Sequence, residues 1–448
     1  MYLPGAEEWG LDSPEVNGTD VYHSGSGRVR DEWLSRCREE RALTTDLMSE
    51  VISLPNLTAS LKRVISNGGT GGVDGMTVKD LSVWFSTHYQ TLIGDLKTNQ
   101  YRVSQIRGVQ IPKAKGGYRQ LGIPTVKDRL VQQGINLVLE RYLDPTFSQY
   151  SYGFRKGKGT RPCLKQACAY VEGGYRYIVD IDLAKFFDEV NHDRLLWMLS
   201  RRIGDKRLLK LISKFLKSGL MEGGLSNQRT KGTPQGSPLS PLLSNIVLDE
   251  LDKELERRGL RFVRYADDMI IFVGSRKAAE RVMLSVSRFI EGRMQLKVNK
   301  DKSGIRQPHE LNFLGHSIVG KGELGLSNPS LQRLKQKLRA KTRRNRGISL
   351  EQLVRELNLL MRGWLNYFRE AKIKGKLEKI MGWLRRRIRC YRLRQCKRAI
   401  GIVRFLRKLK IPEWRCWLLA LSSKGWYNKS CTPQAHEGMN QEWFTSIG

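Results

Sequence analysis

Two neighbouring acids, Asp267 and Asp268, interrupt an otherwise apolar stretch that reads FVRYADDMIIFV at positions 262–273. The flanking runs are rich in β-branched and aromatic residues, which predicts two short buried strands joined by a tight turn. Both carboxylates would then lie at the tip of a hydrophobic hairpin. Such a pair can be a polar turn or a set of oxygen ligands for a hard cation such as Mg²⁺. The stretch alone leaves both interpretations open.

A second acidic stretch, YIVDIDLAKFFDEVNHDRLL at 177–196, offers a partner for the hairpin. A strand here would place Asp180 and Asp182 on one face. If its end meets the hairpin, Asp182, Asp267 and Asp268 would form a two-metal pocket of the kind that catalyses phosphoryl displacement. Three acids can share a dry interior only when cations neutralise them. Asp180 remains the rival ligand to Asp182.

The charge of the chain predicts a polyanionic partner. Its 448 residues include 79 Lys and Arg against 44 Asp and Glu, a net charge of +35 and an isoelectric point near 10.1. Such a field attracts nucleic acid first and an anionic membrane second. No apolar run reaches the roughly 18 residues of a spanning helix, and the polar N-terminus is unlike a targeting peptide. We therefore expect nucleic acid as the partner and no membrane.

The seven cysteines are scattered and form no C-x-x-C pair. An odd, dispersed set argues against a disulfide framework or a zinc ribbon and for reduced thiols. We therefore expect a soluble cytoplasmic protein.

The positive charge is concentrated near the C-terminus. Residues 331–410 hold 27 Lys and Arg but only 4 Asp and Glu. Apolar residues recur there every three or four positions, as in LEQLVRELNLLMRGWLNYF at 350–368, which predicts amphipathic helices. The region also carries Trp364, Tyr367, Trp383 and Tyr391. A small helical bundle with a basic, aromatic-bearing surface favours nucleic-acid binding over a merely solvated face.

Strand and helix signals alternate between about residue 100 and residue 320, which indicates an α/β region. The predicted strands are YIVDIDL, RFVRYA, MIIFV and ELNFLGHSIVG. The predicted helices are TVKDRLVQQGINLVLERYL, HDRLLWMLSRRI, DKRLLKLISKFLKSG and SPLLSNIVLDELDKELERRG.

Six motifs in one order give the chain a family resemblance. FVRYADDMIIFV resembles the Y-x-D-D signature of reverse transcriptases, and DIDLAKFFDEVNH resembles their first metal-binding strand. TPQGSPLSPLLSNIVLDELD resembles their P-Q-G motif, and IPKAKGGYRQLGIP resembles their fingers motif. LKVNKDKSGI and LNFLGHSI resemble the motif after the catalytic hairpin and the primer grip. Together they cover about residues 105–320.

Two further stretches narrow the resemblance to group II intron-encoded reverse transcriptases, or maturases. LPNLTASLKRVISNGGTGGVDGMTV resembles their N-terminal extension, and LVRELNLLMRGWLNYF resembles their thumb, the maturase (X) domain. The chain ends at Gly448 without the Cys- and His-bearing endonuclease of many members, so it resembles the endonuclease-lacking bacterial class C type.

The resemblance implies a mixed α/β (α+β) right-hand polymerase with fingers and palm, followed by an α-helical thumb/maturase domain. Five segments follow from it: an N-terminal arm, an N-terminal extension or fingers segment, the fingers and palm, the thumb/maturase domain, and a C-terminal nucleic-acid-binding appendage. Their expected bounds are 1–45, 46–105, 106–325, 326–412 and 413–448.

The resemblance also implies site roles. Asp182, Asp267 and Asp268 would be the catalytic metal ligands for two Mg²⁺ ions, for which Mn²⁺ could substitute. The dNTP-binding residues would be Lys113, Arg119, Phe186, Phe187, Gln235, Gly236 and Lys302. One of the two phenylalanines would be the gate that excludes a 2′-hydroxyl, and the other would belong to the core. Lys302 would lie beside the leaving pyrophosphate.

The implied activity is RNA-directed DNA synthesis: copying intron RNA into cDNA while the protein also assists splicing and mobility. The implied partners are group II intron RNA, an RNA template/DNA primer duplex, target DNA and dNTPs. A homodimer through the N-terminal extension stays open. Two alternatives also remain, a maturase that only assists splicing and a reverse transcriptase used in phage defence or CRISPR adaptation.

Overall fold

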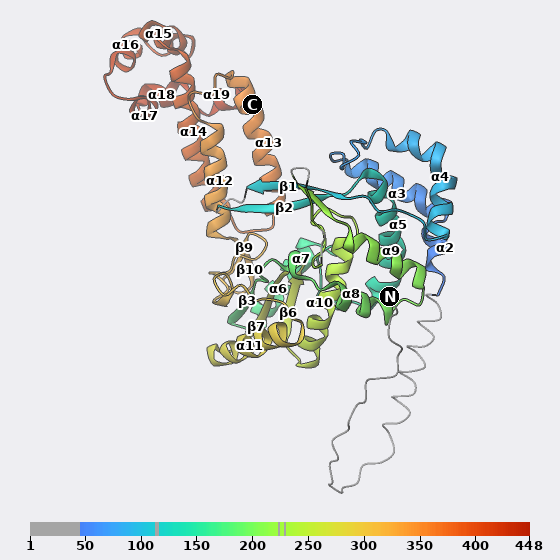
Figure 1. Cartoon of the computed structure of the whole chain (residues 1–448). Helices are drawn as coiled ribbons and strands as arrows, with labels where there is room; N and C mark the ends of the chain where they lie inside the picture. Colours follow the sequence, from blue (N-terminus) through green and yellow to red (C-terminus); the bar gives the residue numbers. More distant parts are fainter. Residues whose placement is uncertain (1–44, 113–115, 223–224, 228–229) are drawn as a thin grey trace.

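A computed structural model of the chain describes residues 45–112, 116–222, 225–227 and 230–448. Almost all of the expected N-terminal arm therefore lies outside the described residues. Figure 1 shows two sheets and a β-hairpin surrounded by helices, with the C-terminal helices, coloured orange to red, rising to one side. The predicted mixture of strands and helices, followed by a helical C-terminal region, is confirmed.

The central sheet has four strands in the order β6-β7-β3-β8. Their bounds are β3 Tyr177–Ile181, β6 Arg261–Tyr265, β7 Asp268–Val273 and β8 Gly304–Arg306. All neighbouring pairs are antiparallel. The apolar runs predicted from the sequence form β3, β6 and β7, because the side chains of both faces are buried under the helices that cover the sheet.

Helices pack around this sheet and bring their own polar residues to it. α6 contacts β6, α10 contacts β6, and α11 contacts β3, β7 and β8. The helices of this part are α6 Thr160–Glu172, α7 Phe186–Glu189, α10 Ser240–Arg257 and α11 Arg276–Arg288, with the short turns η1 Asp144–Thr146 and η2 Phe289–Arg293.

A second sheet, in the order β2-β1-β4-β5, lies above the first in Figure 1. Its strands are β1 Ile106–Pro112, β2 Tyr118–Ile123, β4 Leu220–Glu222 and β5 Leu225–Asn227. β1 and β2 form an antiparallel hairpin, while β1 runs parallel to β4. This hairpin carries the predicted fingers motif.

Six further helices share one hydrophobic core with the central sheet. They are α2 Leu47–Val51, α3 Leu54–Asn67, α4 Leu81–Lys97, α5 Val126–Leu143, α8 His192–Ser200 and α9 Lys206–Lys217. α5 begins where the sequence predicted, because the Thr125 hydroxyl accepts a hydrogen bond from the backbone N–H of Asp128 and caps the first turn.

From residue 328 to residue 448, all of which the structure describes, every regular element is a helix. The helices are α12 Asn328–Lys341, α13 Leu350–Phe368, α14 Lys374–Gln395, α15 Ala399–Lys408, α16 Glu413–Leu421, α17 Trp426–Ser430, α18 Pro433–Gly438 and α19 Gln441–Ser446. Residues 413–448 pack into the same core as α12–α15, since Cys416, Leu419 and Trp443 join that cluster.

The helix predicted from the spacing of apolar residues at 350–368 is confirmed as α13. Leu353, Leu357 and Met361 point into the core. Ser349 caps it by accepting a hydrogen bond from the N–H of Gln352.

The strand predicted at 310–320 is shorter than expected. The hairpin β9 His316–Val319 and β10 Glu323–Leu326 begins only after a turn, in which Leu314 and Gly315 have left-handed φ values of 50° and 79°. Such backbone cannot continue a strand. Within the described residues, no helix is both long and apolar enough to cross a membrane.

Candidate active site

The acidic hairpin forms where the sequence placed it. Tyr265 at the end of β6 pairs with Asp268 at the start of β7, and Ala266 and Asp267 make the connecting turn. Ala266 adopts a left-handed backbone with φ 58°, which is uncommon for a residue with a Cβ. Gly153 packs directly against this turn. A Cβ at position 153 would lie only 2.2 Å from the backbone nitrogen of Ala266, so a larger residue would not fit there.

Asp182 directly follows β3 and approaches the hairpin from the next strand. Ile181 pairs with Met269, so continuing the same register brings Asp182 opposite Asp268. The backbone of Asp182 is fixed at both ends: its N–H donates to the Ser303 hydroxyl at 3.0 Å, and its C=O accepts from Asn299 at 2.8 Å. The structure therefore brings the three predicted metal ligands to one end of the sheet.

Burial and neighbouring negative charges raise the pKa values of two of these carboxylates, Asp267 and Asp268. Burial, together with the charge of Asp182, raises the pKa of Asp267. For Asp268, burial comes first and the charges of Asp267, Asp182 and Asp180 follow, raising its pKa to about 6. The Asp268 side chain remains accessible to solvent, so the surrounding protein removes only part of its hydration. Neither Asp267 nor Asp268 forms a salt bridge within the described residues, whereas Asp182 and Asp180 do.

Two cations of the chain face this negative charge. Lys302 Nζ binds Asp182 Oδ2 at 3.0 Å, and the charge of Lys302 partly opposes the rise in the pKa values of Asp267 and Asp268. The charge of Arg119, on β2 of the fingers hairpin, also partly opposes the rise in the pKa of Asp267. Lys113, the other predicted triphosphate ligand, lies outside the described residues.

The rival ligand Asp180 has a partner of its own. Arg306 on β8 donates from Nε to Asp180 Oδ2 at 2.8 Å. Burial raises the pKa of Asp180, and the hydrogen bond and charge of Arg306 oppose that shift. Asp180 is therefore held by a guanidinium one step back from the hairpin turn.

The two phenylalanines occupy different environments. Phe186 is only 2% exposed and belongs to the core, whereas Phe187 is partly exposed. Their rings meet edge to face with centroids 5.3 Å apart. The backbone C=O of Phe187 accepts a hydrogen bond of 2.7 Å from the N–H of Thr233, which joins the backbone at Phe187 to the P-Q-G loop.

The P-Q-G loop joins the fingers hairpin to the acidic centre. The Gln235 C=O accepts a hydrogen bond of 2.9 Å from the N–H of Gly122 on β2. Gly236 has φ 123°, and a Cβ there would lie 2.6 Å from the Gly122 oxygen. Only glycine fits this position without moving the backbone.

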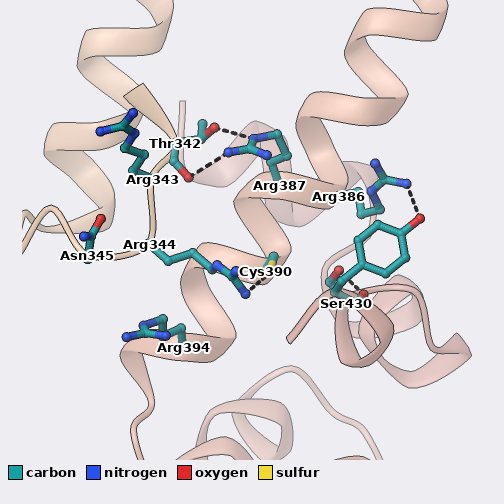
Figure 2. A pocket seen from close by; sticks show the side chains of 10 residues that line it. Thr342, Arg343, Arg344, Asn345, Arg386, Arg387, Cys390, Arg394 and Ser430 are labelled. Carbon is teal, nitrogen blue, oxygen red and sulfur yellow. Dashed lines mark hydrogen bonds between the residues drawn. The ribbon is translucent and has the colours of Figure 1, made fainter. Parts of the chain in front are cut away.

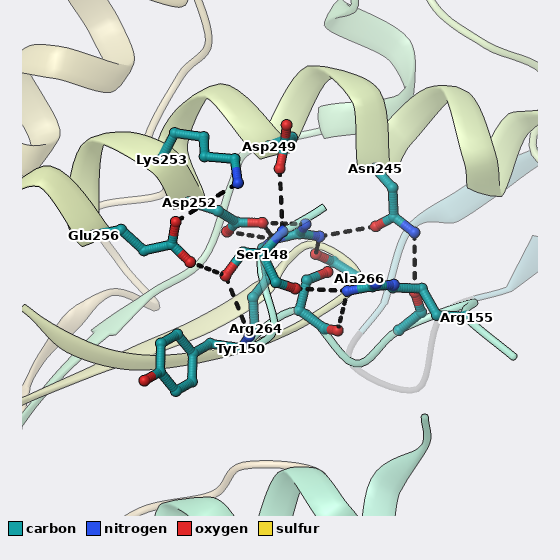
Figure 3. A network of polar contacts seen from close by, with 12 residues as sticks. Ser148, Tyr150, Arg155, Asn245, Asp249, Asp252, Lys253, Glu256, Arg264 and Ala266 are labelled. Atoms are coloured by element: carbon teal, nitrogen blue, oxygen red, sulfur yellow. Dashed lines mark hydrogen bonds and ion pairs between the residues drawn. The ribbon is translucent and has the colours of Figure 1, made fainter. Parts of the chain in front are cut away.

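A buried network behind the hairpin escaped the sequence reasoning (Figure 3). Arg264 on β6 is fully buried and binds the equally buried Asp252 of α10, with Nε–Oδ1 at 2.8 Å. Arg264 Nη1 also donates to the C=O of Ala266 at 2.9 Å and to Asn245 at 3.0 Å. Asn245 in turn donates to the C=O of Gly153. The network therefore fixes the backbone of Ala266 at the turn and the backbone of Gly153, which packs against it.

The signal for this network was present in the sequence. An arginine interrupts the apolar run just before the acidic pair, and Asn245, Asp249 and Asp252 recur at four and three residues along one helix face. Asp249 extends the network, since it accepts from Arg202 at 2.8 Å and from the Ser148 N–H.

The interleaved aromatics of the basic region divide between core and surface. Tyr391 is buried, so its predicted place on a nucleic-acid surface is wrong: its ring packs in the helical core and its hydroxyl donates to the Ile348 C=O. Tyr367 is 46% exposed. Trp383 is partly exposed and lies beside the guanidinium groups of Arg339 and Arg387.

Comparison with known protein families gives two matches. Residues 111–318 match the family described as reverse transcriptase (RNA-dependent DNA polymerase). Residues 331–409 match the group II intron maturase-specific domain. The first match covers the acidic hairpin, the P-Q-G loop and the central sheet, and it makes this chain an RNA-directed DNA polymerase by class.

Several curated relatives are similar over much of the chain. Protein YkfC of Escherichia coli K12 is 30% identical over 326 residues, which cover 62% of this chain and 84% of that protein. The group II intron-encoded protein LtrA of Lactococcus lactis subsp. cremoris is 29% identical over 293 residues, 51% of this chain and 49% of that protein. The putative COX1/OXI3 intron 2 protein of Saccharomyces cerevisiae is 28% identical, over 62% of this chain and 39% of its own length.

The chain belongs to the family of group II intron-encoded reverse transcriptases and maturases. It spans less than half of the Lactococcus and yeast relatives. Among solved structures, a chain of the partial Cas6-RT-Cas1–Cas2 complex is 27% identical, with a TM-score of 0.35 and coverage of 55% of this chain and 43% of that one. The assignment rests on the sequence matches.

Reverse transcriptases act with divalent metal ions. Within the described residues, no three His, Cys, Asp or Glu side chains converge closely enough to hold an ion as they stand. The donor set nevertheless fits such ions: the facing groups are carboxylates, which hard cations prefer. Burial and the charges of neighbouring acids disfavour the ionised forms of Asp267 and Asp268, as their raised pKa values indicate, and a bound cation would stabilise those ionised forms.

Proposed function

We propose that this chain copies RNA into DNA at the centre formed by Asp182, Asp267 and Asp268. The observation that carries the proposal is the placement of these acids at the same end of the sheet, near Lys302 and Arg119, in a chain of the reverse transcriptase family. Carboxylates without salt bridges, close to a lysine and an arginine, suit a site that receives both metal ions and a triphosphate.

Asp182, Asp267 and Asp268 would hold two Mg²⁺ ions, with Mn²⁺ as a substitute. Bound there, such ions stabilise the charge on the attacking and leaving oxygens of the phosphoryl transfer. Lys302 binds Asp182 in the present arrangement. If Asp182 held a cation instead, Lys302 would be free to contact the leaving pyrophosphate, to which it could donate a proton.

The remaining predicted residues would bind the dNTP. Arg119 would contact the triphosphate with its guanidinium fork, and Lys113 would assist as a point charge. Phe187 is the better candidate for the sugar gate, because its ring is partly exposed while Phe186 is core. Gln235 and Gly236 would let the loop backbone approach the nascent base pair.

We further propose that the helical region binds group II intron RNA and assists its splicing, and that the protein also binds an RNA template/DNA primer duplex and target DNA. The excess of 27 basic over 4 acidic residues in 331–410 supports this role. The five-segment division and a location at the bacterial nucleoid, within the cytoplasm, belong to the same proposal. A maturase that only assists splicing would be the conclusion if no DNA were made. A reverse transcriptase used in phage defence or CRISPR adaptation would be the conclusion if DNA were made but intron RNA were not bound.

The test is primer extension on a generic RNA template with dNTPs and Mg²⁺, comparing Asp182→Asn with Asp180→Asn. Asp182→Asn is expected to reduce extension by about a thousandfold, since a metal ligand supplies several kcal/mol of transition-state stabilisation. Asp180→Asn removes one charge from the same strand but leaves the turn, and is expected to cost about tenfold or less. Equal losses would contradict the assignment of Asp182 as the ligand, and no extension by the unmodified protein would contradict the polymerase itself.

A further inference from the structure

An arginine-lined cavity of about 430 Å³ opens in the helical region, far along the chain from the acidic centre. Its walls are the loop after α12, one face of α14 and the short helix α17 (Figure 2). Five arginines line it, and no Asp or Glu does. We call this cavity the arginine pocket; its arginines are Arg343, Arg344, Arg386, Arg387 and Arg394.

The pocket arginines lack acidic partners within the described part of the chain, whereas their neighbours have them. Arg346, two residues beyond Arg344, binds Glu356 at 2.9 Å, and Lys341 binds the same carboxylate at 2.8 Å. The acids of this region are thus used just outside the pocket. The concave surface keeps a concentrated positive charge that an anion would neutralise.

Part of this surface is held rigidly. Arg387 donates from Nη2 to the backbone oxygens of Arg339 and Thr342 at 3.2 and 3.3 Å, and its guanidinium lies 5.1 Å from the centroid of the Trp383 ring. Burial lowers the pKa of Arg387, and the charges of Arg339, Arg344 and Arg386 lower it further. A preorganised guanidinium loses little freedom when it binds a phosphate.

An aromatic ring stands at the edge of the same pocket. Tyr427 on α17 is 55% exposed, and its hydroxyl accepts a hydrogen bond of 2.8 Å from Arg386 Nη1. Arg386 also lies 4.5 Å from the ring centroid, so the ring has a fixed position. Exposed rings next to guanidinium groups are the usual platforms on which unpaired RNA bases stack.

We propose that the arginine pocket binds one unpaired nucleotide of a folded RNA, with Arg344 and Arg394 contacting its phosphates and its base stacking on Tyr427. The cavity is in the size range of sites for single small ligands, not of a groove that follows a duplex. The inference rests on the proposed RNA-binding role and names the RNA feature that the helical region recognises.

The experiment measures binding of the full chain to two RNA hairpins that are identical except for one unpaired adenosine in the stem of the first. The unmodified protein is expected to bind the bulged hairpin about tenfold more tightly, a ratio that one base stacked on an aromatic ring provides. Equal affinity for the two hairpins would overturn the proposal.

Variants assign the preference to the pocket. Tyr427→Leu should abolish the difference between the hairpins while leaving affinity for the paired one unchanged, and Tyr427→Phe should retain the difference. Arg344→Gln with Arg394→Gln should weaken the bulged hairpin more than the paired one. The matched control, Arg404→Gln with Lys408→Gln on exposed positions of α15, should weaken both equally. A preference that survives in Tyr427→Leu, or is lost in Tyr427→Phe, would overturn the stacking assignment.

Failure of this inference is distinguishable from failure of the proposed function. Primer extension on an unstructured template needs the acidic centre and not an unpaired nucleotide in the pocket. Normal extension without a bulge preference overturns only the pocket assignment. A bulge preference without extension overturns the polymerase and leaves the pocket assignment supported.

Discussion

The acidic centre and the arginine pocket are opposite in charge and alike in design. In the centre, Asp182 and Asp180 have cationic partners, whereas Asp267 and Asp268 have pKa values raised by burial and by the charges of neighbouring acids. In the pocket, the arginines have no acids within the described residues. Each region retains one sign of charge at the place where a partner of the other sign would bind.

The two regions differ in how their functional groups are supported. Behind the acidic turn, the charges of Arg264 and Asp252 are fully buried and paired. Around the pocket, backbone carbonyls and aromatic rings hold the arginines instead. The centre therefore depends on an ion pair whose burial removes both charges from water, whereas the pocket lies on helices that pack around an apolar core. Substitutions should damage the first region more severely.

The largest effect on folding is expected from Arg264→Met, because it leaves Asp252 buried without a partner. Losing one member of a buried pair costs about 3–5 kcal/mol, or on the order of 10 °C in the unfolding temperature. Calorimetry measures this loss.

The double variant Arg264→Met with Asp252→Leu separates stability from positioning. It should recover much of the unfolding temperature, because no charge remains buried. Primer extension should stay low, since nothing then holds the Ala266 carbonyl. Recovery of both together would show that the network has no positioning role.

Gly236→Ala should have the next largest effect. The new Cβ would collide with the Gly122 oxygen and push the P-Q-G loop away from the fingers hairpin. A displacement of about 1 Å costs about a hundredfold in rate. The rate of single-nucleotide incorporation measures this loss. Gly274→Ala serves as the control because a Cβ there meets no neighbour within 4 Å. Similar rates for the two variants would contradict the close approach.

The two phenylalanines should separate specificity from stability. Phe187→Ala is expected to raise incorporation of rNTPs relative to dNTPs by about tenfold, because the partly exposed ring no longer blocks the 2′-hydroxyl. Phe186→Ala should leave sugar choice unchanged and cost about 3–4 kcal/mol of stability, since that ring is core. Relaxed selectivity in Phe186→Ala alone would reverse the assignment.

The smallest effect concerns pH. In the folded state the pKa of Asp268 is raised to about 6, above its ordinary value of 3.8, so the folded chain binds more protons than the unfolded chain between these values. The contribution of this group to stability is present below pH 4 and is lost as the pH rises through about 6. With divalent ions chelated, Asp268→Asn should unfold about 1–3 °C above the unmodified protein at pH 8, and no higher than it below pH 4. A difference independent of pH would contradict this origin.

Local sequence patterns predicted the elements whose causes are local. An acid pair between two apolar runs predicted the hairpin, and apolar residues every three or four positions predicted α13. The strand predicted at 310–320 begins later than expected because left-handed backbone at Leu314 interrupts it. A leucine in the sequence gives no indication of such a turn.

The support of the site could not be predicted because it comes from distant parts of the chain. Arg264 meets Asp252 and Asn245 only when β6 packs on α10. The sequence FF cannot reveal which ring is buried, because both belong to one short helix whose packing decides it. The burial of Tyr391 likewise follows from how the helices of the C-terminal region meet.

The most direct test of the account measures primer extension and RNA affinity on the same preparation of Asp267→Ala with Asp268→Ala. Loss of the two carboxylates proposed to hold the metal ions should reduce extension by about a thousandfold or more. Affinity for structured RNA should stay within about twofold, since the basic helices are untouched. Extension within tenfold of the unmodified protein would contradict the assignment of the acidic centre, and a parallel loss of RNA affinity would contradict the separation of the two regions.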